Sequence, residues 1–283
     1  MQLRHYSITR SFGAIYRMAL SEQHVSQFQQ EGYTAVPHFF DAREVAALQA
    51  EVERFKREGL VRNVATDGDG QTPSQNKANL QLIPLYDKSD LIRALPFVPR
   101  VGEAITQLIG APAILHLDQM FLKPGRHGAG TDWHQDNAYF KVADPLRGTA
   151  MWIAIHDATV VNGTIHVVPG SHREQYEHGR DPNSDHHIHC SVPEERAVPI
   201  ELAAGGVAFF CYGTAHCTKA NNTDGERAGM AFHFLHCDYV PEARMASEKP
   251  LISGPQATGG EREYGVRVDD AWDGEVERTL APA

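Results

Sequence analysis

Hydrophobic positions recur at helical intervals in the first third of the chain. Asp41, followed three residues later by Glu44, matches the capping box that opens many helices. Apolar residues then follow at steps of three and four, on one face of a helix: Val45, Leu48, Val52 and Phe55. This pattern predicts an amphipathic helix that ends near Gly59.

Two further helices are predicted on either side of this one. The first opens at Ser21, runs to about Glu31 and stops at Gly32, and the other runs from about Pro99 to Ile109. A short strand is expected at Tyr33–Val36, between the first two helices. Residues 21–112 therefore form a mainly helical support region in this interpretation.

From Ala113 onward, short β-type runs replace the helical pattern, and Gly, Pro and Asn punctuate them. The expected strands are Ile114–Lys123, Thr149–Ile155, Thr164–Val168, Val198–Leu202, Val207–Tyr212 and Ala228–Cys237. Strands at this spacing predict a sandwich or barrel over residues 113–240, within a single domain of residues 1–283. The polar segment Arg173–Glu195 is interpreted as a long excursion between strands, and residues 241–283 as a loosely packed C-terminal tail.

Composition narrows the class of protein. The 283 residues are 42% hydrophobic and 22% charged, as in a soluble globular enzyme, and the net charge of −10 argues against a nucleic-acid surface. The sequence contains no run of 18 or more apolar residues, so no membrane span is predicted. The N-terminus lacks the apolar core of a secretory signal. The four cysteines show no disulfide framework, which favours a cytoplasmic location. The sixteen histidines favour a metal-binding protein, although their number alone does not locate a site.

The sharpest local motif is Trp133-His134-Gln135-Asp136. Residues i and i+2 of a strand share one face, so an imidazole and a carboxylate at this spacing can converge on one ion. His216, at the end of a later strand, is the candidate third ligand. Two histidines and one carboxylate form the facial triad of non-haem Fe(II) oxygenases, which leaves coordination positions for a 2-oxo acid and O₂.

Arg227 lies eleven residues after His216, on the next predicted strand. A bidentate oxo acid needs a partner for its far carboxylate, and a guanidinium offers a planar fork of donors that matches a carboxylate. His-x-Asp, a later His and this Arg are together far more specific than any one of them.

With these residues in place, the chain resembles the phytanoyl-CoA dioxygenase family, which includes ectoine hydroxylase and many natural-product oxygenases. The resemblance covers most of the chain from about Glu22 to Asp238. Its matching runs are Trp133–Asp136, Met151-Trp152-Ile153-Ala154, and Asn162–His172 with its Val-Pro-Gly turn, followed by His216 and Arg227.

The resemblance implies a double-stranded β-helix, or jelly roll, with the helical region leading. It implies Fe(II) ligation by His134, Asp136 and His216, and a salt bridge from Arg227 to the distal carboxylate of 2-oxoglutarate. Three further residues match positions that touch the co-substrate in related members: Gln119, Trp152 and Lys77. Gln119 could equally be a buried polar strand residue, and Trp152 is expected to serve the core as well as the site.

The expected activity is that of a dioxygenase acting on a small-molecule substrate with 2-oxoglutarate and O₂, releasing succinate and CO₂. Asp136 favours hydroxylation, because halogenating relatives replace this carboxylate with a small residue; desaturation, epoxidation and ring closure remain open. The absence of a basic cluster favours a free metabolite over an acyl-CoA. The pocket is expected between the N-terminal helices, the Ala65–Gln75 loop and the Arg173–Glu195 excursion.

Two other classes of function stay open. A zinc-dependent hydrolase could use the same His/Asp/His site around an activated water, and it would have no need of Arg227. A noncatalytic small-molecule-binding β-helix protein is the second alternative. The cluster His186-His187-His189 is interpreted as part of a polar loop, and the sequence does not decide which way His166 faces.

Overall fold

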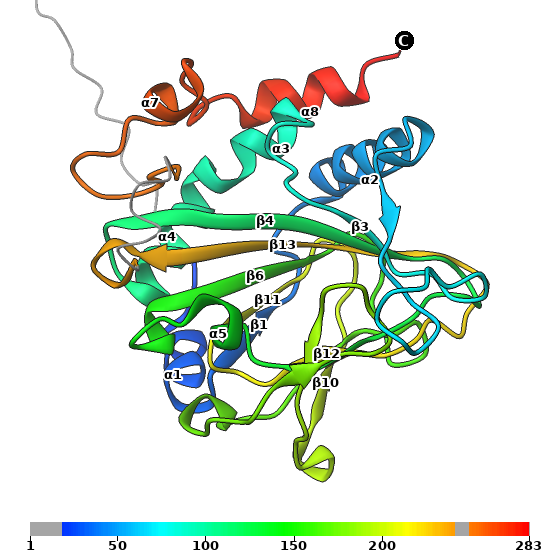
Figure 1. The fold of residues 1–283 in the computed structure, drawn as a ribbon. Coiled ribbons are helices and arrows are strands. Elements are labelled where there is room, and N and C mark those ends of the chain that lie inside the picture. The colour runs from blue at the N-terminus through cyan, green and yellow to red at the C-terminus, as the bar shows by residue number, and fades with distance from the viewer. Residues whose placement is uncertain (1–18, 241–248, 283) are drawn as a thin grey trace, which may run out of the picture.

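Two antiparallel sheets face one another in the computed structural model, which describes residues 19–240 and 249–282. Helices cover the outer face of the larger sheet (Figure 1). The seven-stranded sheet has the order β1-β11-β6-β13-β4-β3-β2, and the four-stranded sheet has the order β10-β7-β12-β5. A separate two-stranded ribbon pairs β8 with β9. The strands of the two sheets and of this ribbon are β1 Tyr33–Val36, β2 Arg62–Asn63, β3 Leu80–Leu82, β4 Ala113–Lys123, β5 Thr131–His134, β6 Gly148–Ala154, β7 Ile165–Val167, β8 Gly179–Arg180, β9 Ile188–His189, β10 Val198–Ile200, β11 Val207–Cys211, β12 His216–Thr218 and β13 Arg227–His236.

The three helices predicted in the N-terminal region begin and end close to where the sequence predicts, and the short helix α3 was not predicted. Ser21 and Asp41 cap α1 and α2, each in a capping box, and Gly32 ends α1 with φ 83°, in the left-handed region that glycine favours. The helices in the described residues are α1 Glu22–Glu31, α2 Ala42–Arg57, α3 Asp90–Ala94, α4 Pro99–Ile109, α5 Asn137–Phe140, α7 Glu261–Tyr264 and α8 Trp272–Leu280.

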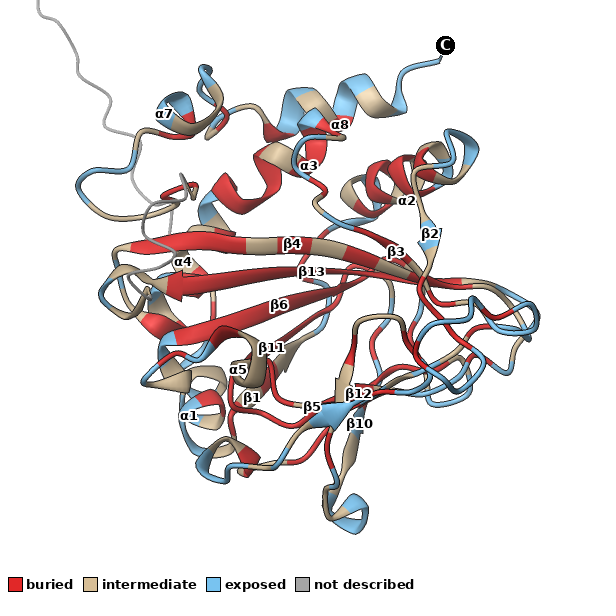
Figure 2. Ribbon diagram, in the orientation of Figure 1, coloured by how far each residue is buried: buried red, intermediate tan, exposed pale blue. Residues whose placement is uncertain are grey.

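Alternation along the central strands divides the core in two. On β6, Met151 and Ile153 face the helices, whereas Trp152 and Ala154 face the four-stranded sheet. Both faces are largely apolar, so β6 is buried along its whole length and β13 along all but its last residue (Figure 2). The predicted jelly-roll fold is confirmed; the two sheets remain separate and form no closed barrel.

The C-terminal segment differs from the prediction. Residues 249–282 were expected to pack loosely, yet α8 lies against α2, and Trp272 and Val276 are part of the main core. The Trp272 indole donates to Glu44, which also accepts from Arg100 of α4. The prediction is wrong because two apolar residues at helical spacing, within a polar segment, suffice to bury one helix face.

The loops near the sheet edge are more ordered than a polar composition suggests. Ala65 forms an isolated bridge with Ser184, and the Thr66 hydroxyl donates to the Pro182 carbonyl. The 65–75 loop and the 173–195 excursion are therefore joined to one another. In the described part of the chain, no helix is long and apolar enough to cross a membrane.

Candidate metal and co-substrate site

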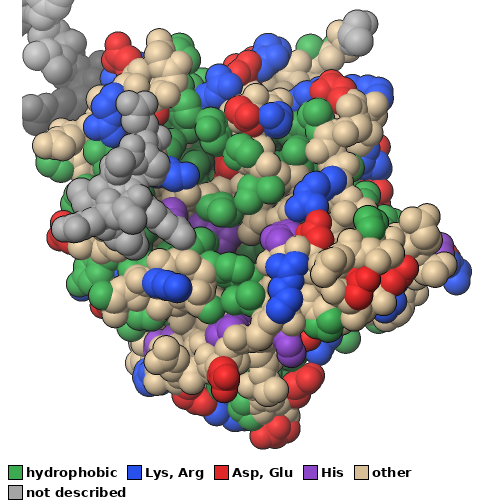
Figure 3. Space-filling model, viewed as in Figure 1, with side chains coloured by type: hydrophobic (Ala, Val, Ile, Leu, Met, Phe, Trp, Pro, Cys, Tyr) green, Lys and Arg blue, Asp and Glu red, His purple; other side chains and the backbone are tan. Residues whose placement is uncertain are grey.

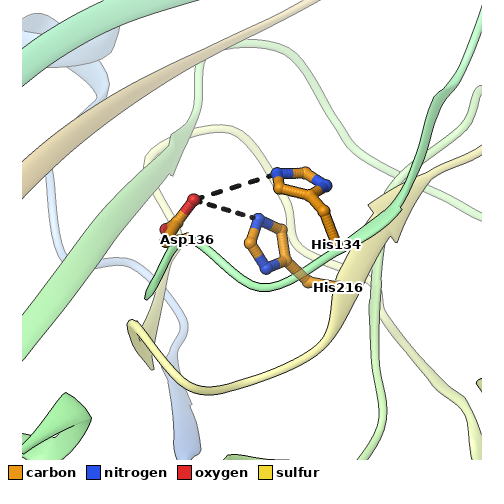
Figure 4. A group of neighbouring side chains, drawn as sticks. All are labelled: His134, Asp136 and His216. Carbon is orange, nitrogen blue, oxygen red and sulfur yellow. Dashed lines mark ion pairs between the residues drawn. The ribbon is translucent and has the colours of Figure 1, made fainter. Parts of the chain in front are cut away.

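Three side chains converge between the two sheets. His134 ends β5 and His216 begins β12, and the two residues are direct partners in the antiparallel pair. Asp136 follows two residues after His134, where the chain enters α5. One potential ligand atom from each residue lies within 4.8 Å of the others (Figure 4). The three side chains are only 12%, 7% and 9% exposed, for His134, Asp136 and His216 in turn.

Backbone carbonyls fix the orientation of both imidazoles. Nδ1 of His134 lies 2.8 Å from the Asp132 carbonyl oxygen, and Nδ1 of His216 lies 3.0 Å from that of Thr214. A carbonyl only accepts, so each Nδ1 carries the ring proton and each Nε2 presents a lone pair. The Nε2 atoms lie 3.8 Å and 3.9 Å from Oδ1 of Asp136. This tautomer is the one that a metal-binding histidine needs.

The electrostatics of the cluster keep its ligands in their metal-binding protonation states. Burial, together with the nearby His216, lowers the pKa of His134 to about 4, and burial also lowers the pKa of His216. Burial alone would raise the pKa of Asp136, but the imidazoles of His216, His233 and His134 outweigh it and hold that pKa well below its usual range. Neutral imidazoles and an ionised carboxylate therefore coexist at neutral pH.

Gln135, between the two ligands of the motif, ties their loop to the segment before His216. Its side-chain Nε2 donates to the carbonyl oxygens of Gly213 at 2.6 Å, Glu174 at 2.9 Å and Ser171 at 3.3 Å. Gln135 is buried and points away from the cavity, since i and i+1 alternate. Its amide therefore positions His134, Asp136 and His216 relative to one another without reaching the site.

A cavity of about 210 Å³ contains the triad and extends between the sheets. Its wall is largely aromatic and aliphatic, with a few neutral polar side chains. Figure 3 shows histidine side chains among hydrophobic ones on the face of the molecule that it presents. The lining residues other than the triad are Gln81, Ile83, Leu117, Gln119, Phe121, Thr131, Tyr139, Phe140, Trp152, Ile165, His186, His187, Phe210, Cys217, Thr218, Arg227, Ala231 and His233.

Arg227 lines the same cavity and is fully buried. One of its terminal nitrogens donates to the Gly163 carbonyl, its guanidinium carbon lies 5.6 Å from the centre of the Trp152 ring, and its Nε has no hydrogen-bond partner among the described residues. Burial lowers the pKa of Arg227 to about 10, which leaves the guanidinium charged at neutral pH. A buried cation that no described carboxylate neutralises is suited to an anionic ligand.

A buried lysine lies opposite Arg227 on the neighbouring strand. Lys123 is its partner on β4, and its side-chain nitrogen donates to the Thr218 hydroxyl at 2.7 Å. Burial, and then the charge of Arg227, lower the pKa of Lys123 well below its ordinary value. The Thr218 oxygen also accepts from the Thr131 amide at 3.1 Å, so the hydroxyl proton remains to be donated into the cavity.

Most residues singled out from the sequence lie in this cavity. Gln119 and Trp152 both line it, and Gln119 accepts a hydrogen bond from the side-chain amide of Gln81 at 3.0 Å. Tyr139 also lines it, whereas the Asn137 side chain hydrogen-bonds the backbone of Val142 and lies elsewhere.

Lys77 is not brought to the cavity. It is exposed and lines a separate hollow with Arg126 and Lys219. The Lys77 amide donates to the Ser74 hydroxyl, and its carbonyl accepts from the Asn63 side chain. The predicted contact of Lys77 with the co-substrate therefore finds no support in the structure.

The orientation of the two histidine segments is now clear. His166 alternates with the buried Ile165 and Val167 and does not line the cavity. His186 and His187 do line it, on the 173–195 excursion, whereas His189 does not.

The expected surroundings of the pocket are only partly right. The N-terminal helices and the 65–75 loop contribute no lining residue, because the seven-stranded sheet separates the helices from the cavity.

One residue close to the triad escaped the sequence interpretation. His233 lies on β13 with Nε2 3.3 Å from Oδ2 of Asp136, and it is 4% exposed. Counting in twos along β13 from Arg227 reaches Gly229, Ala231 and then His233, so the strand pattern places all four on one face. The alternation was therefore available as a signal, although the pairing with Asp136 was not.

The residues present fit an Fe(II) ion and a dicarboxylate co-substrate. Two imidazole lone pairs and one carboxylate oxygen suit a facial triad, and the unneutralised Arg227 lies in the same cavity. A jelly roll with this donor set defines a non-haem iron oxygenase that depends on 2-oxoglutarate.

The family follows from comparison with known proteins. Residues 28–229, more than half of the chain, match the model of the phytanoyl-CoA dioxygenase (PhyH) family, so the chain belongs to that family.

Similar proteins include enzymes with small substrates. The chain is 28% identical to the ectoine dioxygenase of Bordetella parapertussis, over 75% of this chain and 74% of that protein. It is 27% identical to the L-proline trans-4-hydroxylase of Streptomyces griseoviridis, over 71% and 81%. Among solved structures, the epimerase SnoN from nogalamycin biosynthesis, in complex with Fe³⁺, α-ketoglutarate and nogalamycin RO, matches with a TM-score of 0.65 and 25% identity, over 78% and 86%.

Proposed function

We propose that this dioxygenase hydroxylates a free small molecule while 2-oxoglutarate is converted to succinate and CO₂. One observation carries the proposal: a single buried cavity holds the convergent His134, Asp136 and His216 and the unneutralised guanidinium of Arg227. A zinc hydrolase would need the first feature and not the second.

Each group has a distinct task in this proposal. Nε2 of His134, Oδ1 of Asp136 and Nε2 of His216 would hold the metal, and iron supplies the activation of O₂ that side chains cannot perform. Arg227 would bind the distal carboxylate of 2-oxoglutarate through its fork of donors, and the Thr218 hydroxyl would donate to the same group. Trp152 forms the adjoining wall, and Gln119 faces the same space.

The lining indicates the kind of substrate. Ile83, Leu117, Phe121 and Phe140 give the cavity an apolar wall, and Gln81 adds a neutral polar group. Among the described lining residues, Arg227 is the only lysine or arginine, and it is assigned to the co-substrate. We therefore favour a substrate with an apolar body and uncharged hydrogen-bonding groups. Hydroxylation is favoured over halogenation because the carboxylate of Asp136, which halogenating relatives replace with a small residue, is present in the triad.

The test is anaerobic addition of Fe(II) and 2-oxoglutarate to the purified chain, followed by visible absorption. We expect a weak charge-transfer band in the wild type. His134→Ala should abolish it, and Arg227→Ala should shift its appearance to higher 2-oxoglutarate concentrations. His166→Ala, a histidine outside the cavity, is the matched control and should leave the band unchanged. A folded wild type that binds iron but gives no band would contradict the proposal and favour the hydrolase or the binding protein.

A further inference from the structure

His233 has no part in metal binding or co-substrate binding as described so far, yet it contacts the carboxylate of the triad. We propose that His233 is a positioning residue, which holds Oδ2 of Asp136 so that Oδ1 alone is presented to the metal. The inference concerns the free protein's metal affinity and can be tested without the oxygenase reaction.

The two oxygens of Asp136 have different neighbours. Oδ1 lies 3.8 Å from Nε2 of His134 and 3.9 Å from Nε2 of His216. Oδ2 lies on the other side, 3.3 Å from Nε2 of His233 in an ion-pair contact, and none of the described residues forms a hydrogen bond with it. Oδ1 thus faces the two ligand imidazoles of the four-stranded sheet, and Oδ2 faces the His233 imidazole of the seven-stranded sheet.

The chemistry of the contact sets the tautomer of His233. An ionised carboxylate only accepts hydrogen bonds, so a contact with Nε2 is favourable only when Nε2 carries the proton. A protonated Nε2 has no lone pair for a metal, which separates His233 from the three ligands. His233 therefore acts through Asp136 rather than on the ion.

Packing fixes the His233 ring in this position. β13 pairs with β4 and β6 on its two sides, and His233 lies opposite Leu117 and Ala150. The Phe140 ring contacts it edge-on, with centroids 5.5 Å apart and planes at 76°. Phe140 belongs to α5, and its amide donates to the Asp136 carbonyl at 3.1 Å. Phe140 therefore contacts both the backbone of Asp136, through its amide, and the His233 ring that lies against the Asp136 side chain.

Loss of the His233 contact would free the carboxylate. Rotation about Cβ–Cγ would exchange Oδ1 and Oδ2, because the nearest polar group to the buried Oδ2 would be gone. Supporting residues of this kind change metal affinity by about 10- to 100-fold when they are removed. A monodentate Asp136 also leaves more coordination positions for other ligands than a carboxylate that binds through both oxygens.

Two near-isosteric variants separate this role from simple packing. The side-chain amide of glutamine can place an N–H near Nε2 of His233, whereas that of asparagine reaches only the position of Nδ1. We would measure Mn(II) binding to the metal-free full chain by calorimetry, without 2-oxoglutarate. His233→Gln should bind close to the wild type, while His233→Asn and His233→Leu should bind about 10- to 100-fold more weakly.

A control variant, a folding check and a double variant complete the experiment. His166→Leu, outside the cavity, should not change Mn(II) affinity, and thermal unfolding of the metal-free variants checks their folding. In an Asp136→Ala background, His233→Leu should have no additional effect. Equal losses in His233→Gln and His233→Asn, or an unchanged affinity in His233→Leu, would overturn the proposal. The Mn(II) measurement needs neither 2-oxoglutarate nor oxygenase turnover. Its outcome for His233 therefore does not depend on whether the charge-transfer test of the proposed function succeeds.

Discussion

The two sheets position their functional residues by different means. The four-stranded sheet carries two metal ligands on strands of three and four residues, β12 and β5, and the third lies just beyond β5. Local polar contacts fix them: two imidazole-to-carbonyl bonds and the Gln135 amide. The seven-stranded sheet carries Arg227 and Trp152 on long, buried strands, where strand register sets their places and one bond to the Gly163 carbonyl holds the guanidinium. The metal ligands thus depend mainly on hydrogen bonds, and Arg227 and Trp152 depend mainly on packing.

The largest effect on the seven-stranded side should come from Arg227→Leu. Loss of a buried charged partner typically costs about 2–5 kcal/mol of binding, so affinity for 2-oxoglutarate should fall accordingly. Mn(II) affinity in the absence of 2-oxoglutarate should stay close to wild type, because the triad lies on the other sheet. Calorimetry with each ligand checks both. Arg227→Lys keeps the charge but lacks the planar fork of donors, so its affinity for 2-oxoglutarate should lie between that of the wild type and that of Arg227→Leu. A parallel loss of Mn(II) affinity would show that the two sheets are not independent.

Gly229→Ala tests the packing directly. A Cβ at this position would lie 2.6 Å from the Trp152 ring, beside Arg227 on the same face of β13. Overpacking of this kind costs about 1–3 kcal/mol. We expect weaker 2-oxoglutarate binding together with a lower free energy of unfolding. The control Gly225→Ala has open space around its Cβ and should change neither. Unaltered co-substrate affinity in a destabilised variant would show that Trp152 serves only the core.

Gln135→Leu is the corresponding test of the four-stranded side. It leaves the buried Gly213 carbonyl and the partly buried Glu174 carbonyl without this donor, at about 1–3 kcal/mol for each unsatisfied group that water cannot reach, while the Ser171 carbonyl keeps its bond from the Glu174 amide. Denaturant unfolding of the metal-free chain should report this loss. Mn(II) affinity should fall while 2-oxoglutarate contacts remain, the reverse of Arg227→Leu. If Mn(II) affinity is unchanged, the loop is held by other contacts.

The last effect concerns the pH dependence of the metal-free protein. His134 titrates near pH 4 when folded and near 6.5 when unfolded, so the unfolded chain binds more protons between these values. Stability contributed by the neutral imidazole is therefore present above pH 6.5 and lost as the pH falls towards 4, by up to about 1.4 kcal/mol per pH unit for one group. His134→Gln should flatten this slope in pH-dependent unfolding. An identical slope would mean that other groups dominate.

The sequence predicts the site better than its surroundings, for physical reasons. The His134–Asp136 pair follows from period-two alternation, which is local, and ligand chemistry then points to His216 and Arg227. Alternation along β13 also places His233 on the face of Arg227, but its contact with Asp136 depends on how distant segments pair, as does the position of Lys77. Helix caps such as Asp41 are equally local, and α2 begins where they predict.

The C-terminal helix shows the opposite limit. Its burial depends on Trp272 and Val276 meeting α2, a contact across more than two hundred residues that composition cannot reveal. A polar, glycine-rich segment thus conceals one apolar helix face.

The hydrogen bond between Trp272 and Glu44 has a consequence for biosynthesis. Glu44 belongs to the first turn of α2, and it is translated more than two hundred residues before its partner Trp272. Arg100 can pair with Glu44 once α4 has emerged, but the Phe40 ring and the α2 face lack their Trp272 cover until α8 has been synthesised. The α2 helix therefore waits for a distant segment of the chain to complete its packing, and a nascent chain released before residue 272 would expose the apolar surface of α2.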